Sequence, residues 1–320
     1  MHPPFMTTAS APGKIILFGE HAVVYGRPAL AVPVTQVRAS ATVSANSSGG
    51  VWIEAPNINL ICELSHLASN HPLSAVINSL FSALRISRQP ACTIHIESTI
   101  PVAAGLGSGA AVSVVILRAL SAFLGQPLPD ERVNELAFEI EKLHHGSPSG
   151  IDNSVVTYAK PIYFIKGSPI RPCRVGKAFT IVIGDTGISA LTKESVGALR
   201  KLWEAEPSHW DKVFDQIGKI VQNARRAIER GETTELGRLM DANHALLQEM
   251  TVSSLELDAL VESARKAGAL GAKLSGGGRG GNMIALVSTE KAASLAEALR
   301  TAGAKRTIIS TIQSNYRARI

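Results

Sequence analysis

The chain has 320 residues, of which 45% are hydrophobic and 18% charged, and its formal net charge is +6. This length allows two domains with separate cores, and the composition is ordinary for a globular protein. Only 5% of the residues are aromatic and no block of Lys and Arg occurs, so no nucleic-acid partner is expected.

Cysteine usage and hydropathy predict a cytoplasmic protein. The three cysteines are far apart and lack Cys-x-x-Cys spacing, so neither a disulfide framework nor a zinc site is expected. The first eight residues lack the apolar core of a signal peptide. No run of 18 apolar residues predicts a membrane span, so no membrane partner is expected.

The first 54 residues predict strands joined by turns. Apolar runs and period-two alternation put the expected strands at 9–18, from about 29, at 37–45 and at 51–54. The first turn carries Glu20 and His21, and Lys14 lies in the strand before it. These three side chains share one short unit and can converge on a site. The alternative is that Glu20 and His21 are surface residues at a strand end.

A glycine-rich stretch, PVAAGLGSGAA over Pro101–Ala111, follows a predicted helix at 72–84 and a predicted strand at 91–97. The apolar run 110–124 predicts a helix after it, which ends at Gly125. Glycine permits a positive φ and the close approach of a ligand, and the N–H groups that begin a helix suit phosphate. The stretch therefore predicts a phosphate-binding loop, with a tight strand-to-helix turn as the alternative.

Two standard nucleotide motifs do not describe this loop. A Walker A sequence occurs nowhere in the chain. Gly105, Gly107 and Ala110 match the Rossmann pattern G-x-G-x-x-A, but Pro101 interrupts the strand that should lead into it. The nearest acids, Asp130–Glu131, open a helix where the Rossmann pattern needs an acid at the end of a second strand. A different class of phosphate loop is expected.

Two acidic residues after this helix are candidates for chemistry. Asp130 is expected to cap a helix whose last turn holds Glu141. A carboxylate there opposes the helix dipole at a cost of about 0.3–1 kcal/mol, which suggests a metal role, although exposed helices tolerate such charges. Asp152 follows among the small residues of 146–153, where a structural Asx-turn is the alternative. A strand is expected over 158–165.

Residues 55–70 are irregular and polar and predict a mobile loop over a site. The segment 167–176 has two prolines and a glycine at either end, and it marks the expected boundary between domains 1–170 and 171–320. The second domain is expected to be α+β. Its expected strands are 179–183, 272–274, 283–287 and 307–312, and its expected helices are 190–204, 208–230, 232–249, 254–267 and 290–301, the fourth opened by a Ser253-to-Glu256 capping box.

Three blocks, 11–25, 101–111 and 273–285, resemble in content and order the motifs of the GHMP kinases, a family that includes galactokinase and homoserine, mevalonate and phosphomevalonate kinases. Within it the chain is most similar to the mevalonate kinases, through GEHAVVYG at 19–26 and an E-x-x-x-H-G-x-P-S-G-x-D-N pattern at 141–153. The resemblance implies a two-domain α+β GHMP kinase fold, with a ribosomal protein S5 domain 2-like N-terminal domain and a ferredoxin-like C-terminal domain.

The resemblance also implies an activity, the phosphorylation of (R)-mevalonate by ATP with Mg²⁺ in isoprenoid biosynthesis, and it is compatible with a homodimer. Asp152 would accept the hydroxyl proton and Lys14 would keep it ionised. The substrate contacts would be Glu20, His21 and Ser149. The Mg²⁺ ligands would be Glu141 and Ser108. The ATP contacts would be Pro101, Ala104, Gly105, Leu106, Gly107, Ser108, Gly109 and Ala110.

Two positions depart from the family pattern. Gly109 stands where the family has a second serine near Mg²⁺, so Ser108 or water would complete the coordination shell. Arg279 interrupts the third glycine motif, where it either strengthens anion binding or points to solvent. Phosphomevalonate kinase activity, or a non-catalytic sensor of ATP and ligand on the same fold, are the alternatives; a sensor is expected to lack Lys14 or Asp152, and both are present.

Overall fold

The computed structural model describes residues 6–101, 104–145, 148–189 and 192–314. It divides into two compact units that interleave along the sequence. Unit 1 comprises Met1–Gly13, Val37–Pro101 and Leu106–Ala159, and unit 2 comprises Lys14–Gln36, Val102–Gly105 and Lys160–Ile320. The strands β1 (Met6–Phe18) and β2 (Ala29–Ala45) each contribute residues to both units. The domain boundary expected at 167–176 stays a prediction.

The sheet of unit 1 has the strand order β4-β3-β5-β2, and β1 also pairs with β2. Its further strands are β3 (Val51–Ala55), β4 (Leu60–Glu63) and β5 (Cys92–Ser98). Alternate residues such as Val43, Ile53 and Ile94 are fully buried, as the period-two pattern predicts. β3 pairs in parallel with β5, which itself pairs with β2, so β3 does not return beside β2 after the turn at 46–50.

The segment 55–70, expected to be an irregular loop, contains short regular elements. Two single-turn 3-10 helices, η2 (Pro56–Ile58) and η3 (Leu64–His66), flank β4. β4 pairs antiparallel with β3, with Trp52 opposite Glu63. The expectation of an irregular loop was wrong because this polar stretch adds an outer strand to the sheet, where only one face needs apolar residues.

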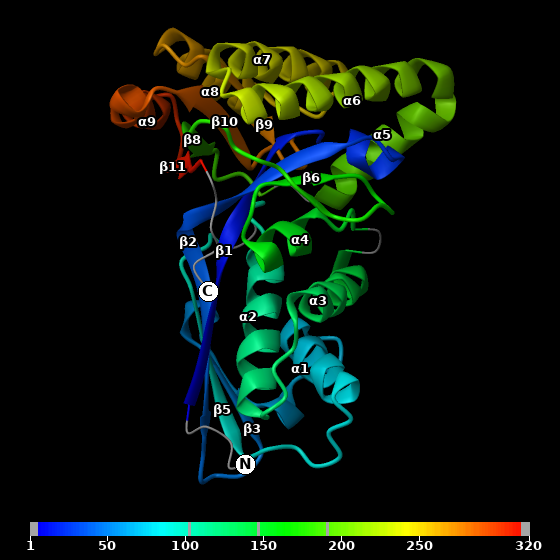
Figure 1. The fold of residues 1–320 in the computed structure, drawn as a ribbon, viewed down its shortest axis with the longest axis vertical. Coiled ribbons are helices and arrows are strands. Elements are labelled where there is room, and N and C mark those ends of the chain that lie inside the picture. The colour runs from blue at the N-terminus through cyan, green and yellow to red at the C-terminus, as the bar shows by residue number, and fades with distance from the viewer. Residues whose placement is uncertain (1–5, 102–103, 146–147, 190–191, 315–320) are drawn as a thin grey trace. The chain divides into compact units, whose positions relative to one another are not determined.

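Four helices lie on one face of this sheet (Figure 1): α1 (Pro72–Ala83), α2 (Ser108–Phe123), α3 (Asp130–His145) and α4 (Ile151–Tyr158). α2 is apolar along almost all of its length and packs against the other three helices and β5. Gly107 (φ 75°) precedes it and Gly125 (φ 73°) follows it. Both adopt the left-handed backbone conformation that glycine reaches at little cost.

Two local predictions in unit 1 were wrong. The segment that begins at Ile151 forms helix α4, where a turn was expected, and the strand expected over 158–165 is confirmed only for Ile162–Phe164. Ile151 and Val155 lie one helical turn apart and are both buried, so packing outweighs the strand preference of the β-branched residues. Asp130 begins α3 rather than preceding it, and its carboxylate pairs with the Arg118 guanidinium at 2.6 Å.

Unit 2 contains a four-stranded antiparallel sheet with the order β11-β8-β10-β9. The strands are β8 (Phe179–Asp185), β9 (Gly271–Ser275), β10 (Asn282–Val287) and β11 (Arg306–Ile312). Its helices are α5 (Thr192–Ala205), α6 (Pro207–Arg230), α7 (Thr233–Glu249), α8 (Leu255–Lys266) and α9 (Ala292–Thr301), the last preceded by η4 (Thr289–Lys291). Numbered along the chain, the strands are ordered 4-1-3-2, the ferredoxin-like arrangement, which confirms the predicted fold class.

The capping box predicted for α8 is shifted by one residue. Ser254 is the N-cap, and its hydroxyl accepts a hydrogen bond from the Leu257 N–H at 3.3 Å. Ser253 instead donates to Asp258 Oδ1 at 2.5 Å. Two adjacent serines offer the same capping chemistry, so only the backbone path decides which one caps.

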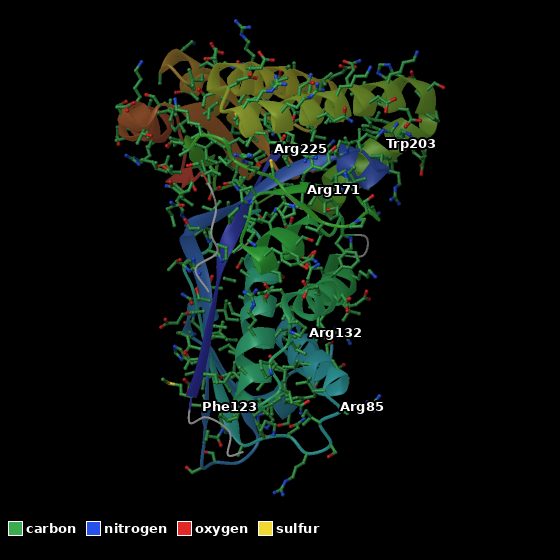
Figure 2. The ribbon with its side chains drawn as sticks, in the orientation of Figure 1. Arg85, Phe123, Arg132, Arg171, Trp203 and Arg225 are labelled. Atoms are coloured by element: carbon green, nitrogen blue, oxygen red, sulfur yellow. The ribbon has the colours of Figure 1, made fainter. Side chains whose placement is uncertain are left out.

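The turn after β1 is held within unit 2 by aromatic and ionic contacts. It continues into η1 (Ala22–Tyr25), and the first part of β2 then pairs with β6 (Ile162–Phe164), which pairs with β7 (Arg171–Pro172). The Tyr25 ring stacks on Phe214 of α6 with centroids 4.2 Å apart, and its centroid is 5.4 Å from that of Trp203. Trp203, on α5, is labelled in Figure 2. Arg27 pairs with Asp215 at 3.0 Å, so this turn is anchored to α6.

Candidate active site

The turn Gly19-Glu20-His21 directs two polar side chains into the interior of unit 2. Gly19 has φ 94°, and a Cβ at that position would lie 2.5 Å from the Pro28 carbonyl oxygen, so only glycine fits. His21 has φ 59°, an uncommon backbone conformation for a residue other than glycine. Glu20 and His21 are only 1% and 5% exposed. They are buried at the end of β1, and the surface alternative for them is wrong.

Glu20 forms a buried ion pair with Lys273, a residue of β9. The Lys273 Nζ donates to Glu20 Oε1 and also to the Leu274 carbonyl at 2.6 Å, and it lies 6.0 Å from the Phe18 ring centroid. Burial raises the pKa of Glu20, while the charge of Lys273 and its hydrogen bond, with a smaller effect of Lys14, oppose the rise. Burial lowers the pKa of Lys273, and Glu20 opposes that shift. Each partner therefore stabilises the other's charge.

His21 is neutral at pH 7 and has a defined tautomer. Its Nε2 lies 3.1 Å from the Gly277 carbonyl oxygen, which can only accept, so Nε2 carries the proton. Burial, opposed by this hydrogen bond and reinforced by the charges of Arg279 and Lys273, lowers the pKa of His21 to about 4. The unprotonated Nδ1 is therefore a hydrogen-bond acceptor.

Glu20 and His21 each have one acceptor without a protein partner in the part of the chain that the structure describes. Within the described residues, Glu20 Oε2 and His21 Nδ1 are both buried without a hydrogen bond. Buried polar atoms in native proteins are normally paired with protein, water or ligand. Hydroxyl groups of a bound molecule are donors of the kind that these two acceptors lack.

Lys14 and Asp152 lie in different units, so their expected pairing stays a prediction. Lys14 is buried in the second half of β1, and its charge acts on Glu20. Asp152 is in the first turn of α4, directly after Gly150 with φ 89° and Ile151. The Ser149 hydroxyl accepts from the Ile151 N–H at 3.4 Å, which brings Ser149 to the same helix end as Asp152. A negative charge is favoured at that end of a helix.

The glycine-rich loop ends at the start of α2, which begins at Ser108, two residues earlier than expected. Gly107 occupies the N-cap position, and no side chain there occupies the first N–H groups of the helix. Ser108 and Gly107 are half-buried, Gly109 is exposed, and Ala110 is buried. The first turn of α2 thus offers N–H groups and a hydroxyl, as a phosphate site requires.

Ala104 and Gly105, earlier in the loop, belong to unit 2, whereas Pro101 belongs to unit 1. The Ala104 carbonyl accepts a hydrogen bond from the buried Asn282 side chain at the start of β10. Gly105 follows with φ 71° and is exposed, whereas Leu106, in unit 1, is buried. Pro101 is half-buried, and residues 102–103 lie outside the described part of the chain.

The expected metal ligands are oxygen donors. Glu141 is half-buried in the last turn of α3, and Ser108 offers a hydroxyl at the start of α2. Within the described residues, no three His, Cys, Asp or Glu side chains cluster as a metal site would need. Mg²⁺ commonly binds one or two carboxylates and completes its shell with phosphate oxygens and water, so this donor set fits it.

The third glycine motif connects β9 to β10 and carries Arg279. Gly278 has φ 73°, and a Cβ there would lie 1.9 Å from the Val252 carbonyl oxygen. Arg279 has φ 57°, and its N–H donates to the same carbonyl at 2.8 Å. Its side chain is exposed, and its charge opposes protonation of His21.

Sequence reasoning missed Lys273 and Asn282 as site residues. Lys273 stands between Ala272 and Leu274 in a predicted buried strand, which signals a paired charge, because lysine is almost never fully buried alone. Its partner lies 253 positions away and could not be identified from spacing.

Comparison with known proteins defines the class of the chain. Residues 71–160 match the family model for the GHMP kinases N terminal domain, and residues 224–305 match that for GHMP kinases C terminal. The mevalonate kinase of Thermococcus sibiricus is 39% identical over 313 residues, covering 92% of this chain and 93% of that protein. The mevalonate kinase of Methanothermobacter thermautotrophicus is 33% identical, covering 87% of this chain and 89% of that protein.

A solved structure agrees with these sequences. The crystal structure of L. major mevalonate kinase in complex with R-mevalonate has a TM-score of 0.86 and 29% identity, covering 99% of this chain and all of that one. The chain belongs to the mevalonate kinase family of GHMP kinases and is therefore an ATP-using phosphotransferase with a small-molecule substrate. None of the helices in the described part of the chain has the length and apolar character to span a bilayer.

Proposed function

We propose that the protein transfers the γ-phosphoryl group of ATP to the 5-hydroxyl of (R)-mevalonate. The observation that carries the substrate assignment is the pair of buried acceptors, Glu20 Oε2 and His21 Nδ1, which lack protein partners within the described residues. Mevalonate carries hydroxyl donors that can satisfy them. The relatives that match most of the chain are named mevalonate kinases, which supports the same substrate. Ser149 is proposed as a further substrate contact.

Asp152 and Lys14 are the proposed catalytic pair. Phosphoryl transfer needs an oriented nucleophile and neutralised charge more than covalent catalysis. Asp152 lies in the first turn of α4, where the helix dipole favours a negative charge. Its carboxylate would accept the proton of the substrate hydroxyl. Lys14 would stabilise that carboxylate and the negative charge that develops on the transferred group.

ATP is proposed to bind through its phosphates at the loop before α2. The N–H groups at the start of the helix and the Ser108 hydroxyl supply donors, and Gly107 lets the backbone approach the phosphates. The other contacts proposed in this loop are Pro101, Ala104, Gly105, Leu106, Gly109 and Ala110. Glu141 and Ser108 would hold Mg²⁺, which bridges and neutralises phosphate oxygens when bound.

A coupled ADP-release assay tests this function on mevalonate, phosphomevalonate, galactose and homoserine. Mevalonate should be the substrate turned over, and turnover of phosphomevalonate alone would overturn the assignment. Asp152→Asn should lower kcat by roughly 100-fold or more, and adding Lys14→Met should not multiply that loss. Asp130→Asn, an exposed acid paired with Arg118, is the matched control and should leave kcat unchanged.

A cytoplasmic location and a homodimeric assembly stay predictions for this protein. Cell fractionation tests the first. Sedimentation of the purified chain, at concentrations around the assay concentration, tests the second. A monomer that is fully active in the ADP-release assay would contradict any role of a dimer in catalysis.

A further inference from the structure

The strand that carries Lys273 is an edge strand whose free side is covered by a helix. Among the described strands, β9 pairs with β10 and with none on its other side. Its other side faces α7, where a Cβ added to Gly237 would lie 2.2 Å from the Leu270 carbonyl oxygen. This is backbone-to-backbone packing, which covers the open edge and fixes the position of the strand.

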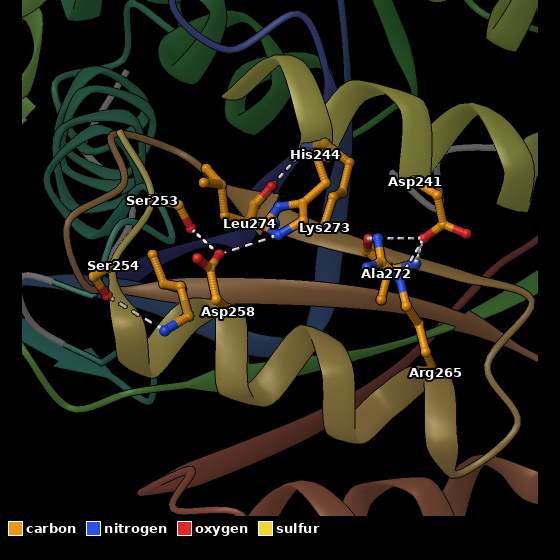
Figure 3. Close-up of polar contacts among 10 residues, drawn as sticks. Asp241, His244, Ser253, Ser254, Asp258, Arg265, Ala272, Lys273 and Leu274 are labelled. Atoms are coloured by element: carbon orange, nitrogen blue, oxygen red, sulfur yellow. Dashed lines mark hydrogen bonds and ion pairs between the residues drawn. The ribbon is translucent and has the colours of Figure 1, made fainter. Parts of the chain in front are cut away.

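Two side chains of α7 accept hydrogen bonds from backbone N–H groups that β9 points away from the sheet (Figure 3). Asp241 Oδ1 accepts from the Ala272 N–H at 3.0 Å, and His244 Nδ1 accepts from the Leu274 N–H at 3.3 Å. Residues 241 and 244 lie about one turn apart on the same face of α7. Residues 272 and 274 lie two positions apart on β9, so their N–H groups point to the same side of the strand, toward that face. The backbone on both sides of Lys273 is thereby held by α7.

His244 lies beside an acidic side chain of α8. Its Nε2 lies 3.2 Å from Asp258 Oδ1, which also accepts from the Ser253 hydroxyl (Figure 3). Because Nδ1 accepts from a backbone N–H, Nε2 carries the proton and faces the carboxylate. The other acceptor also has a neighbour on α8: the Arg265 guanidinium pairs with Asp241 Oδ1 at 2.8 Å. Both acceptors that hold β9 therefore have a charged residue of α8 beside them, Asp258 near His244 and Arg265 paired with Asp241.

The side chain of Lys273 extends from this fixed backbone to Glu20 and is fully enclosed. Its ammonium group is bonded to Glu20 Oε1 and to the Leu274 carbonyl, so it binds one carboxylate oxygen and leaves Oε2 for another donor. Both bonds that the structure shows for this ammonium group go to protein oxygens, so Lys273 acts on the reaction through Glu20.

We propose that Lys273 is a positioning residue for substrate binding, which keeps Glu20 ionised and directs Oε2 toward a substrate hydroxyl. This inference rests on the proposed function, in which Glu20 binds mevalonate. The charged groups that face Glu20 are Lys273 from β9 and Lys14 from β1, and Arg279 acts on the neighbouring His21. Lys273 has the largest opposing effect on the raised pKa of Glu20, so its removal leaves burial to dominate.

The test measures kcat/KM for mevalonate from pH 6 to pH 9 in the wild type and in Lys273→Met. The variant should lose about 10-fold or more at pH 7, mainly through KM, and should recover as the pH rises and Glu20 ionises. A merely structural role would lower activity at every pH alike. Lys266→Met, which removes an exposed lysine paired with Glu262, is the matched control and should leave the profile unchanged.

Two further measurements distinguish loss of the proposed role of Lys273 from misfolding and from failure of the proposed function. The first uses a double variant. In a Glu20→Gln background, Lys273→Met should change kcat/KM by less than about 3-fold, because both act through one carboxylate. This double variant removes both buried charges, so it can fold where the single variant does not. An additional loss there, or a folded Lys273→Met protein with wild-type KM and pH profile, would overturn the proposal.

A measurement without substrate distinguishes failure of this inference from failure of the proposed function. ¹³C NMR titration of the Glu20 carboxyl, identified by its absence in Glu20→Gln, should report a higher pKa in Lys273→Met than in the wild type. An unchanged titration overturns the role of Lys273 whatever the substrate is. Failure of the wild type to phosphorylate mevalonate, with the titration shifted, would refute the proposed substrate alone.

Discussion

Gly271 of β9 and Gly237 of α7 touch backbone to backbone: a Cβ built on Gly271 would lie 2.0 Å from the Gly237 carbonyl oxygen. Neither side of this contact can accept even a methyl group without movement of the helix or the strand. The contact lies two residues from Lys273 and determines how closely α7 covers the edge of the sheet.

Gly271→Ala should therefore destabilise the protein by about 1–3 kcal/mol or more, as overpacking in a close contact does. Urea unfolding measures the change in the free energy of unfolding. Gly197→Ala, on helix α5 with nothing within 4 Å of the added Cβ, is the matched control. It should stabilise by up to about 1 kcal/mol through helix propensity. Equal effects of the two substitutions would contradict the packing argument.

His244 should make stability depend on pH. Burial lowers its pKa to about 4 from an ordinary value of 6.5, so the unfolded chain binds the proton more readily. Stability is retained above pH 6.5 and falls as the pH drops toward 4, by about 2 kcal/mol for this residue between pH 7.5 and pH 5. His244→Asn keeps an acceptor for the Leu274 N–H but does not titrate. Urea unfolding at the two pH values should give a correspondingly smaller loss in the variant; an equal loss would exclude His244.

Glu141→Gln should raise the Mg²⁺ concentration needed for half-maximal activity by roughly 10-fold or more, because a neutral amide is a weaker ligand than a carboxylate. The measurement is a Mg²⁺ titration at saturating ATP and mevalonate. Glu139→Gln lies on the same helix, where Glu139 pairs with exposed Lys142 at 2.7 Å, and it should leave the titration unchanged. Superimposable curves for the two variants would make Glu141 an ordinary helix residue.

Gly107→Val should abolish measurable ATP binding while the protein remains folded. The position has φ 75°, where a residue with a Cβ is strained by roughly 1–2 kcal/mol, and the side chain would stand where phosphate is expected. Gly125→Val is the matched control at the other end of α2, with φ 73° and open space around its Cβ. Calorimetry should detect normal ATP affinity in that control. Equal losses of affinity would attribute the effect to helix strain and not to the loop.

Periodicity and glycine placement were sufficient to predict the long elements. The helices at 72–84, 208–230 and 232–249 and the strands at 179–183 and 283–287 agree with the structure within a few residues, because each buries one continuous apolar face whatever its neighbours are. The left-handed glycines at 105, 107 and 125 follow from the same local logic. The three glycine-rich motifs, read together, also indicated the family.

Where local preference and burial disagree, tertiary packing determines which secondary structure a segment adopts. The segment from Ile151 to Tyr158 is helical although it is rich in β-branched residues, since the helix buries Ile151 and Val155 together. β5 takes the place between β2 and β3, a long-range pairing that no local pattern encodes. The same holds for β4, whose polar sequence is compatible with the outermost position of a sheet.

The site residues also divide into those that the sequence indicated and those whose partners only the fold identified. The sequence by itself determined which residue types stand near each motif: Glu20 and His21 after a strand, Ser108 at a helix start, Asp152 among small residues. Only the tertiary structure joined Glu20 to Lys273, because two charges 253 positions apart can be buried only as a pair, and the fold alone brings them together. It likewise assigned His244 and Asp241 to the edge of β9, since an unpaired strand edge must find its acceptors on whichever helix covers it.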